Sequence, residues 1–164
     1  MESREGRLIA TLQSAGVPFD ACGCGDDLSP YKVAIFLSNK GFKFEERIRN
    51  VEDFIRAGGK ALFFCEAPSP AIYDLLAVVP KGTVKPEPAR QLEKICFTKG
   101  DRRALPGLPQ EILLERFIWQ RPAAMSILSH VEAKTEGAAI GKWQDAANQD
   151  AGYPAIILSP HGAF

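Results

Sequence analysis

The chain has 164 residues, of which 46% are hydrophobic and 24% charged, a composition typical of a soluble globular protein with one domain. Its 20 basic and 20 acidic residues give a formal net charge of zero, so no overall field attracts nucleic acid or an anionic membrane. No apolar run reaches the roughly 18 residues that span a bilayer, and the N-terminus lacks a signal-peptide pattern.

The four cysteines do not follow the pattern of a disulfide framework. Cys22 and Cys24 are too close in sequence to form an unstrained disulfide with each other. Cys65 and Cys96 are at the ends of predicted buried strands. We therefore expect reduced thiols and a cytoplasmic location. A metal bound by Cys22 and Cys24 would need ligands from elsewhere in the chain, so we predict no metal site and no cofactor.

In chain order, the first predicted element is a helix over residues 3–15, because Leu8, Ile9 and Leu12 share one face. Gly16 is suited to the left-handed position after its end. Residues 17–22 are predicted to form a short strand, and a loop rich in turn formers follows.

Residues 31–70 predict a β-α-β unit. Apolar runs at 31–37 and 60–65 are typical of strands covered on both faces. Between them, the helical spacing of Phe44, Ile48, Val51 and Ile55 predicts a helix over residues 44–57. A hairpin through residues 38–41 is the alternative, and the helical spacing up to a glycine pair favours the helix.

The next helix is expected to begin at Pro70 with Ser69 as its cap, and to bury one apolar side. That side consists of Ile72, Leu75, Leu76 and Val79. Further predictions are a connector at 81–88, a strand at 92–98, a loop at 99–109, a helix at 110–120, and strands from 131–143 and 153–158. The last two regions predict an antiparallel β-hairpin added to a parallel sheet.

Three segments, 7–20, 27–37 and 51–63, together resemble the class I glutamine amidotransferase-like superfamily. The likeness is strongest for members attached to glycoside hydrolases, such as the trimerisation domain of β-galactosidases, and residues 139–164 resemble their closing strands. The resemblance implies an α/β, three-layer, flavodoxin-like fold, with a mostly parallel sheet, helices on both faces and the C-terminal antiparallel hairpin. It implies one domain over residues 1–164, and the chain ends are compatible with a piece cut from a longer protein.

Residues 59–68 also resemble, more weakly, the PfpI-like hydrolases and chaperones, which carry a reactive cysteine after a similar strand. Cys65 occupies the matching position, although Glu66 and Ala67 replace the small residue or histidine and the glycine usual there. The resemblance implies a catalytic Cys65 assisted by Glu66 or His161. The alternative for Cys65 is a packing role, because free cysteines are often buried and inert.

Polar residues follow several of the predicted strands. In open α/β sheets, ligands gather at the carboxyl ends of parallel strands. We therefore expect a crevice that binds a sugar or another small polar ligand, with candidates Ser38, Asn39, Glu66, Ser69 and Thr98. Arg102 and Arg103 are candidates for an anion or partner contact, with a solvated loop as the alternative.

Two sharper motifs are incomplete. Residues 137–142 resemble a phosphate-binding loop but have too few residues between the glycines, and Trp143 replaces the Ser or Thr. Glu132 and Lys134 resemble part of a nuclease metal site, yet residues 117–131 contain no acid to complete it. A solvent-facing strand is the expected setting of both residues.

The leading hypothesis is therefore a non-catalytic domain for assembly or ligand binding, linked to carbohydrate-active enzymes. The alternative is a small cysteine-dependent hydrolase or glyoxalase-type enzyme that uses Cys65. The expected partners are further copies of the chain in a homo-oligomer or other domains of a larger protein, and neither a membrane nor nucleic acid is expected.

Overall fold

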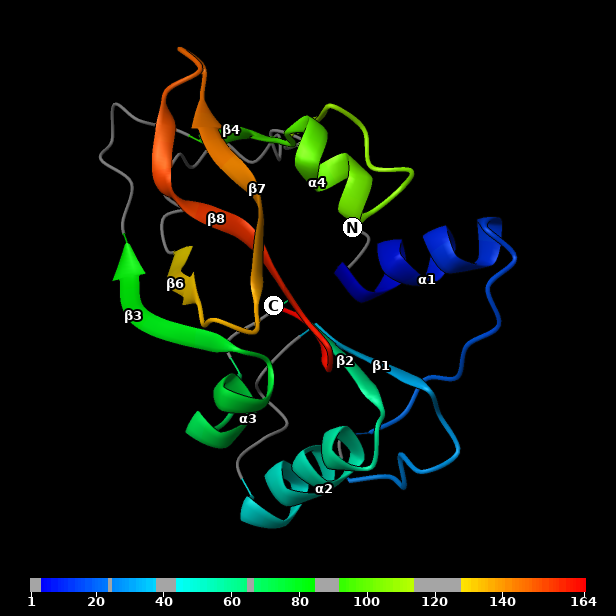
Figure 1. The fold of residues 1–164 in the computed structure, drawn as a ribbon. Coiled ribbons are helices and arrows are strands. Elements are labelled where there is room, and N and C mark those ends of the chain that lie inside the picture. The colour runs from blue at the N-terminus through cyan, green and yellow to red at the C-terminus, as the bar shows by residue number, and fades with distance from the viewer. Residues whose placement is uncertain (1–3, 24, 38–43, 65–66, 85–91, 114–127) are drawn as a thin grey trace, which may run out of the picture. The chain divides into compact units, whose positions relative to one another are not determined.

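The structure, a computed structural model, describes residues 4–23, 25–37, 44–64, 67–84, 92–113 and 128–164 (Figure 1). The chain divides into two compact units, Met1–Ile72 and Tyr73–Phe164. Among the helices in the described ranges, none is long and apolar enough to cross a membrane.

The first unit contains the predicted β-α-β arrangement. Its helices are α1, Arg4–Ser14, and α2, Glu45–Arg56, and its strands are β1, Val33–Phe36, and β2, Lys60–Phe63. β1 and β2 are parallel, in a register that pairs Val33 with Lys60 and Phe36 with Phe63. The prediction of parallel strands joined by a helix is confirmed for this segment.

The buried side of α2 explains why the helix forms in preference to the alternative hairpin. Val51 and Ile55 are fully buried, and Phe54 is 7% exposed. Phe44 was expected on this buried stripe, but it is the residue before the helix and is 61% exposed. The guanidinium of Arg47 lies 5.0 Å from the centre of its ring, a cation–π contact that covers part of the exposed ring.

The segment after α1 differs from its prediction. Gly16 ends α1 in the left-handed conformation as expected, and the Val17 amide donates to the Leu12 carbonyl. Residues 17–22 form no strand, so that prediction was wrong. Val17 and Phe19 are 46% and 37% exposed. These apolar side chains therefore lie at the surface and do not belong to a buried strand.

The second unit is dominated by antiparallel strands. α3, Pro70–Leu75, crosses from the first unit into the second, and α4 spans Lys99–Ala104. The strands are β3, Val78–Val84; β4, Leu92–Cys96; β5, Glu111–Leu113; β6, Leu128–Ala133; β7, Ala138–Asp145; β8, Asp150–Ser159; and β9, Gly162–Ala163. β3 pairs with β6, and the order β9-β8-β7-β4-β5 is antiparallel throughout.

Four predictions from residue 70 onward differ from the structure, one in the length of a helix and three in the type of element. Residues 81–84, which were expected in a connector, belong to β3. The helix that begins at Pro70 ends at Leu75, because Ala77 adopts a φ of 55°, and Val79 lies in β3 instead of on a helix face. Residues 99–104, expected as a loop, form α4. Residues 111–113, expected in a helix, form the edge strand β5, and residues 114–120 lie outside the described part of the chain.

The α/β class is confirmed, whereas a mostly parallel sheet is not. The strand pair of the first unit is parallel, and the described pairs of the second unit are antiparallel. The predicted C-terminal antiparallel hairpin is present as β7 and β8 (Figure 1). The finer prediction of three flavodoxin-like layers with helices on both faces stays a prediction.

Candidate functional site

Four of the predicted site residues lie outside the described part of the chain. These are Ser38, Asn39, Cys65 and Glu66. The proposed nucleophile and most of the expected crevice therefore stay predictions. Ser69, Thr98 and His161 are described, with Ser69 in the first unit and the other two in the second.

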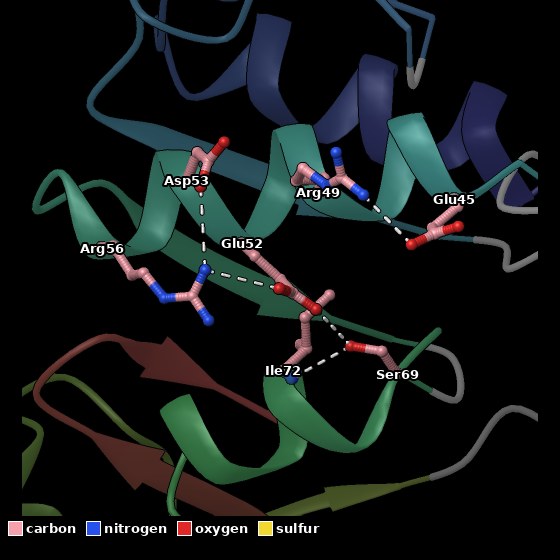
Figure 2. Close-up of polar contacts among 7 residues, drawn as sticks. All are labelled: Glu45, Arg49, Glu52, Asp53, Arg56, Ser69 and Ile72. Atoms are coloured by element: carbon pink, nitrogen blue, oxygen red, sulfur yellow. Dashed lines mark hydrogen bonds and ion pairs between the residues drawn. The ribbon is translucent and has the colours of Figure 1, made fainter.

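Ser69 lies in a polar network between α2 and the start of α3 (Figure 2). Its Oγ accepts a hydrogen bond from the Ile72 amide at 3.2 Å and donates one to Glu52 Oε1 at 2.8 Å. This is the predicted cap of α3, because the hydroxyl satisfies an amide that the first helical turn leaves unpaired. Glu52 Oε2 also pairs with Arg56 at 3.4 Å, which links the network along α2.

The remaining contacts in Figure 2 are ion pairs along the exposed side of α2. Arg56 lies 3.7 Å from Asp53, and Arg49 lies 3.1 Å from Glu45. Both acidic side chains are more than two-thirds exposed, so each pair contributes at most about 1 kcal/mol. Glu52 therefore holds Ser69 in place, and the ion pairs of Arg49 and Arg56 with Glu45 and Asp53 lie on the surface of α2.

Thr98 begins α4 with a capping box. Its Oγ1 accepts from the Asp101 amide at 3.1 Å, and Asp101 Oδ2 accepts from the Thr98 amide at 2.8 Å. The same carboxylate oxygen accepts from the Gly141 amide of β7 at 3.3 Å. Thr98 and Asp101 form the Thr-x-x-Asp pattern of a helix start. The glycine and prolines nearby favour a loop, so the helix was not predicted. Arg102 and Arg103 consequently lie in the last turn of a helix, where Arg102 Nε is buried without a hydrogen-bond partner among the described residues.

His161 lies in the turn between β8 and β9. Its amide donates to Ser159 Oγ at 3.1 Å, which fixes the turn. Its Nδ1 is shielded from solvent and has no hydrogen-bond partner in the described part of the chain. The residue borders a cavity of about 270 Å³, whose lining also includes Asp74, Leu75, Ala77, Glu136 and Pro160. Asp74 and Glu136 were not among the predicted site residues, because no local sequence pattern connects them with residue 161.

The incomplete motifs have structural roles. Residues 138–142 belong to β7 and so form no phosphate loop, while Glu132 pairs with Lys81 at 3.0 Å. Lys134 pairs with Asp74 at 2.7 Å. No group of three or more potential metal ligands occurs among the described residues.

Two described cysteines are free thiols with polar partners. Cys22 lies 3.3 Å from the Tyr31 hydroxyl, and Cys96 donates to Gln144 Oε1 of β7 at 3.0 Å. The hydrogen bond with Cys22, desolvation and the neighbouring Asp20 carboxylate raise the pKa of Tyr31 to about 12. Cys22 is exposed and Tyr31 is half-buried, and the Asp20 carboxylate is the neighbouring titratable group.

No protein-family model and no curated protein matches the sequence, but solved structures match the fold. A β-galactosidase from Rahnella sp. R3 matches with a TM-score of 0.65 at 14% identity, over 99% of this chain and 24% of that chain. A β-galactosidase from Bacillus circulans sp. alkalophilus matches with a TM-score of 0.53 at 14% identity, over 85% and 20% of the two chains. A cytoplasmic protein from Salmonella typhimurium matches with a TM-score of 0.56 at 14% identity, over 95% and 72%.

The chain thus spans about a quarter and a fifth of the lengths of the two β-galactosidases. The resemblance to a domain of β-galactosidases that the sequence indicated is confirmed at the level of the fold. At this identity the likeness establishes the fold alone.

Proposed function

We propose that this chain is a non-catalytic assembly module of a carbohydrate-active protein, in a reducing, cytoplasmic setting. The observation that carries the proposal is its match, over 99% of its length, to a domain-sized part of a β-galactosidase chain. The free thiols of Cys22 and Cys96 fit a reducing compartment.

Exposed apolar side chains on edge strands support the assembly role. Val33 of β1 is 49% exposed, and Leu113 of β5 is 69% exposed. Among the described strands of its own unit, each of these two strands pairs on one side only. An unpaired edge with apolar side chains is a surface that a second copy or another domain can cover.

The non-catalytic part of the proposal is tested by turnover assays on the wild-type chain and Cys65→Ser. Suitable substrates are p-nitrophenyl acetate for a thiol hydrolase, methylglyoxal for a glyoxalase-type enzyme and o-nitrophenyl β-galactoside for a glycosidase. We expect both proteins to give the rate of buffer alone. Steady turnover by the wild-type chain that Cys65→Ser abolishes would establish the cysteine enzyme instead.

A further inference from the structure

The strand β5 stands at the end of the antiparallel order and exposes apolar side chains. It pairs with β4 in a register that places Ile112 opposite Ile95 and Leu113 opposite Lys94. Ile112 is 40% exposed and Leu113 is 69% exposed, compared with 49% for Val33 of the edge strand β1. The side chains of residues 112 and 113 lie on opposite faces of the sheet, because successive residues of a strand alternate. This edge therefore leaves apolar surface in water on both faces.

The hydrogen bonds between β4 and β5 determine which backbone groups point away from the sheet. The Phe97 amide donates to the Gln110 carbonyl at 2.9 Å, in continuation of the β4–β5 register. Hydrogen-bonded and non-hydrogen-bonded pairs alternate along an antiparallel ladder, so the backbone groups of Ile112 also face β4. The amides and carbonyls of Glu111 and Leu113 therefore point toward the open edge. They form no hydrogen bond with a described residue outside β4 and β5.

The residues of β5 lack the features that keep exposed strands apart. Edge strands in monomeric proteins commonly carry a lysine, a proline or a bulge, each of which blocks pairing with another chain. Glu111 is the one charged residue in β5, and Lys94 of β4 pairs with it at 3.2 Å. The pairing of β4 with β5 runs over consecutive residues without a bulge. The composition and geometry of β5 therefore permit another strand to add to it.

The strand is complementary to a second copy of itself. A two-fold axis perpendicular to the sheet at Ile112 places this residue opposite its own copy, and places Glu111 opposite Leu113 of the second copy. In this register the outward backbone groups of both copies meet as hydrogen-bonded pairs, and no like charges lie directly opposite each other. The two Ile112 side chains lie next to each other on one face. We propose that two copies of the chain pair antiparallel through β5 and continue one sheet across this axis. The inference rests on the proposed assembly role, for which it names the surface and the partner.

The shortness of β5 sets the strength of this contact. Its three residues provide about four hydrogen bonds across the axis and bury far less than the roughly 800 Å² per partner that is typical of stable complexes. We therefore expect a weak dimer, which forms at protein concentrations of about 0.1–1 mM.

Disulfide trapping tests the register. The Cα atoms of a non-hydrogen-bonded pair are about 4.5 Å apart, which a disulfide can span. Ile112→Cys is therefore expected to form a covalent dimer when diamide takes up the hydrogens of the two thiols. Leu113→Cys is the matched control, because its two copies would lie diagonally, about 7–8 Å apart. We expect Ile112→Cys to give about fivefold more covalent dimer than Leu113→Cys or the wild type, whose own cysteines set the background.

A backbone substitution tests the hydrogen bonds across the axis. Leu113→Pro removes an outward amide and no bond to β4, so this variant is expected to fold, with the circular dichroism spectrum of the wild type. It is expected to sediment as a monomer at concentrations at which the wild type and Leu113→Val form dimers.

The outcomes separate this contact from the assembly role in general. Oligomers that persist in Leu113→Pro, together with background trapping in Ile112→Cys, would overturn pairing through β5 and leave assembly through another surface in place. A wild-type monomer at every concentration would contradict self-assembly altogether. Protection of the Leu113 amide from hydrogen exchange in that monomer would show that another segment of the same chain covers the edge, which would also overturn the proposal.

Discussion

At the scale of single residues, the glycine pair after α2 carries a specific steric requirement. Gly58 has a φ of 100°, a conformation that side chains rarely adopt, and its amide donates to the Ile55 carbonyl. Gly59 donates to the Phe54 carbonyl, and its Cα lies against the ring of Phe54. A Cβ built on Gly59 would lie less than 3.0 Å from three atoms of that buried ring. The second glycine is therefore required by packing.

We predict that Gly59→Ala lowers the free energy of unfolding by about 1–3 kcal/mol, because the buried Phe54 ring must move. Equilibrium unfolding in urea measures the change. The matched control is Gly100→Ala in α4, where the new Cβ would lie 3.5 Å from Thr98 Oγ1, an ordinary contact. That variant is expected to be neutral or stabilising by up to about 1 kcal/mol, since alanine favours helices. Equal stability of Gly59→Ala and the wild type would contradict the packing assignment.

At the scale of elements, helix ends connect parts of the chain that are distant in sequence. Ser69 caps α3 and also bonds to Glu52, 17 positions earlier in α2 (Figure 2). Asp101 belongs to the capping box of α4 and also accepts from Gly141, 40 positions later in β7. Each capping residue therefore also bonds to another element, Ser69 to α2 and Asp101 to β7.

Replacing Ser69 by Ala is expected to destabilise the protein by about 1 kcal/mol, because the Ile72 amide and Glu52 both lose a partner. Thermal or urea unfolding provides the measurement, and Ser69→Thr, which keeps a hydroxyl, is expected to recover most of the loss. Ser14→Ala is the control, since Ser14 Oγ donates to the Thr11 carbonyl within the exposed helix α1. This variant should change stability by less than about 0.5 kcal/mol. A Ser69→Ala effect no larger than that of Ser14→Ala would show that the cap is not stabilising.

The elements that the sequence predicts correctly are those with a complete local signal. α2 has a helical stripe that ends at a glycine pair, and α3 begins with a serine followed by a proline. Where signals compete, the prediction fails. Thr98 and Asp101 indicate a helix start, but Gly100 and the prolines at 106 and 109 favour a loop. Ile112 and Leu113 fit both a helical and a strand pattern, and the pairing of residues 111–113 with β4 decides between them.

The site is less predictable than the elements because tertiary contacts create it. His161 could be singled out as a titratable residue after a strand, but its neighbours Asp74 and Glu136 come from two distant turns. The φ of 55° at Ala77, which ends α3 early and starts β3, has no signal in its residue type. That residue lines the cavity and also accepts a hydrogen bond from the Lys134 amide, a contact that no sequence spacing encodes.

At the scale of the whole molecule, the proposed assembly role rests on the match of the fold and on exposed apolar side chains. The match covers nearly the whole chain but only 24% of a β-galactosidase chain, so in that enzyme the fold is one part of a longer chain. The described edge strands β1 and β5 expose Val33 and Leu113. Covering such edges within an oligomer removes apolar surface from water, which stabilises the assembled state.

Sedimentation velocity over a range of protein concentrations tests the assembly claim most directly. We expect a mass that is a multiple of the 17.9 kDa chain, and a shift toward the monomer in Val33→Lys or Leu113→Lys. Val17→Lys, which changes a loop residue of similar exposure, should leave the mass unchanged. A mass of 17.9 kDa at every concentration would contradict self-assembly of this chain.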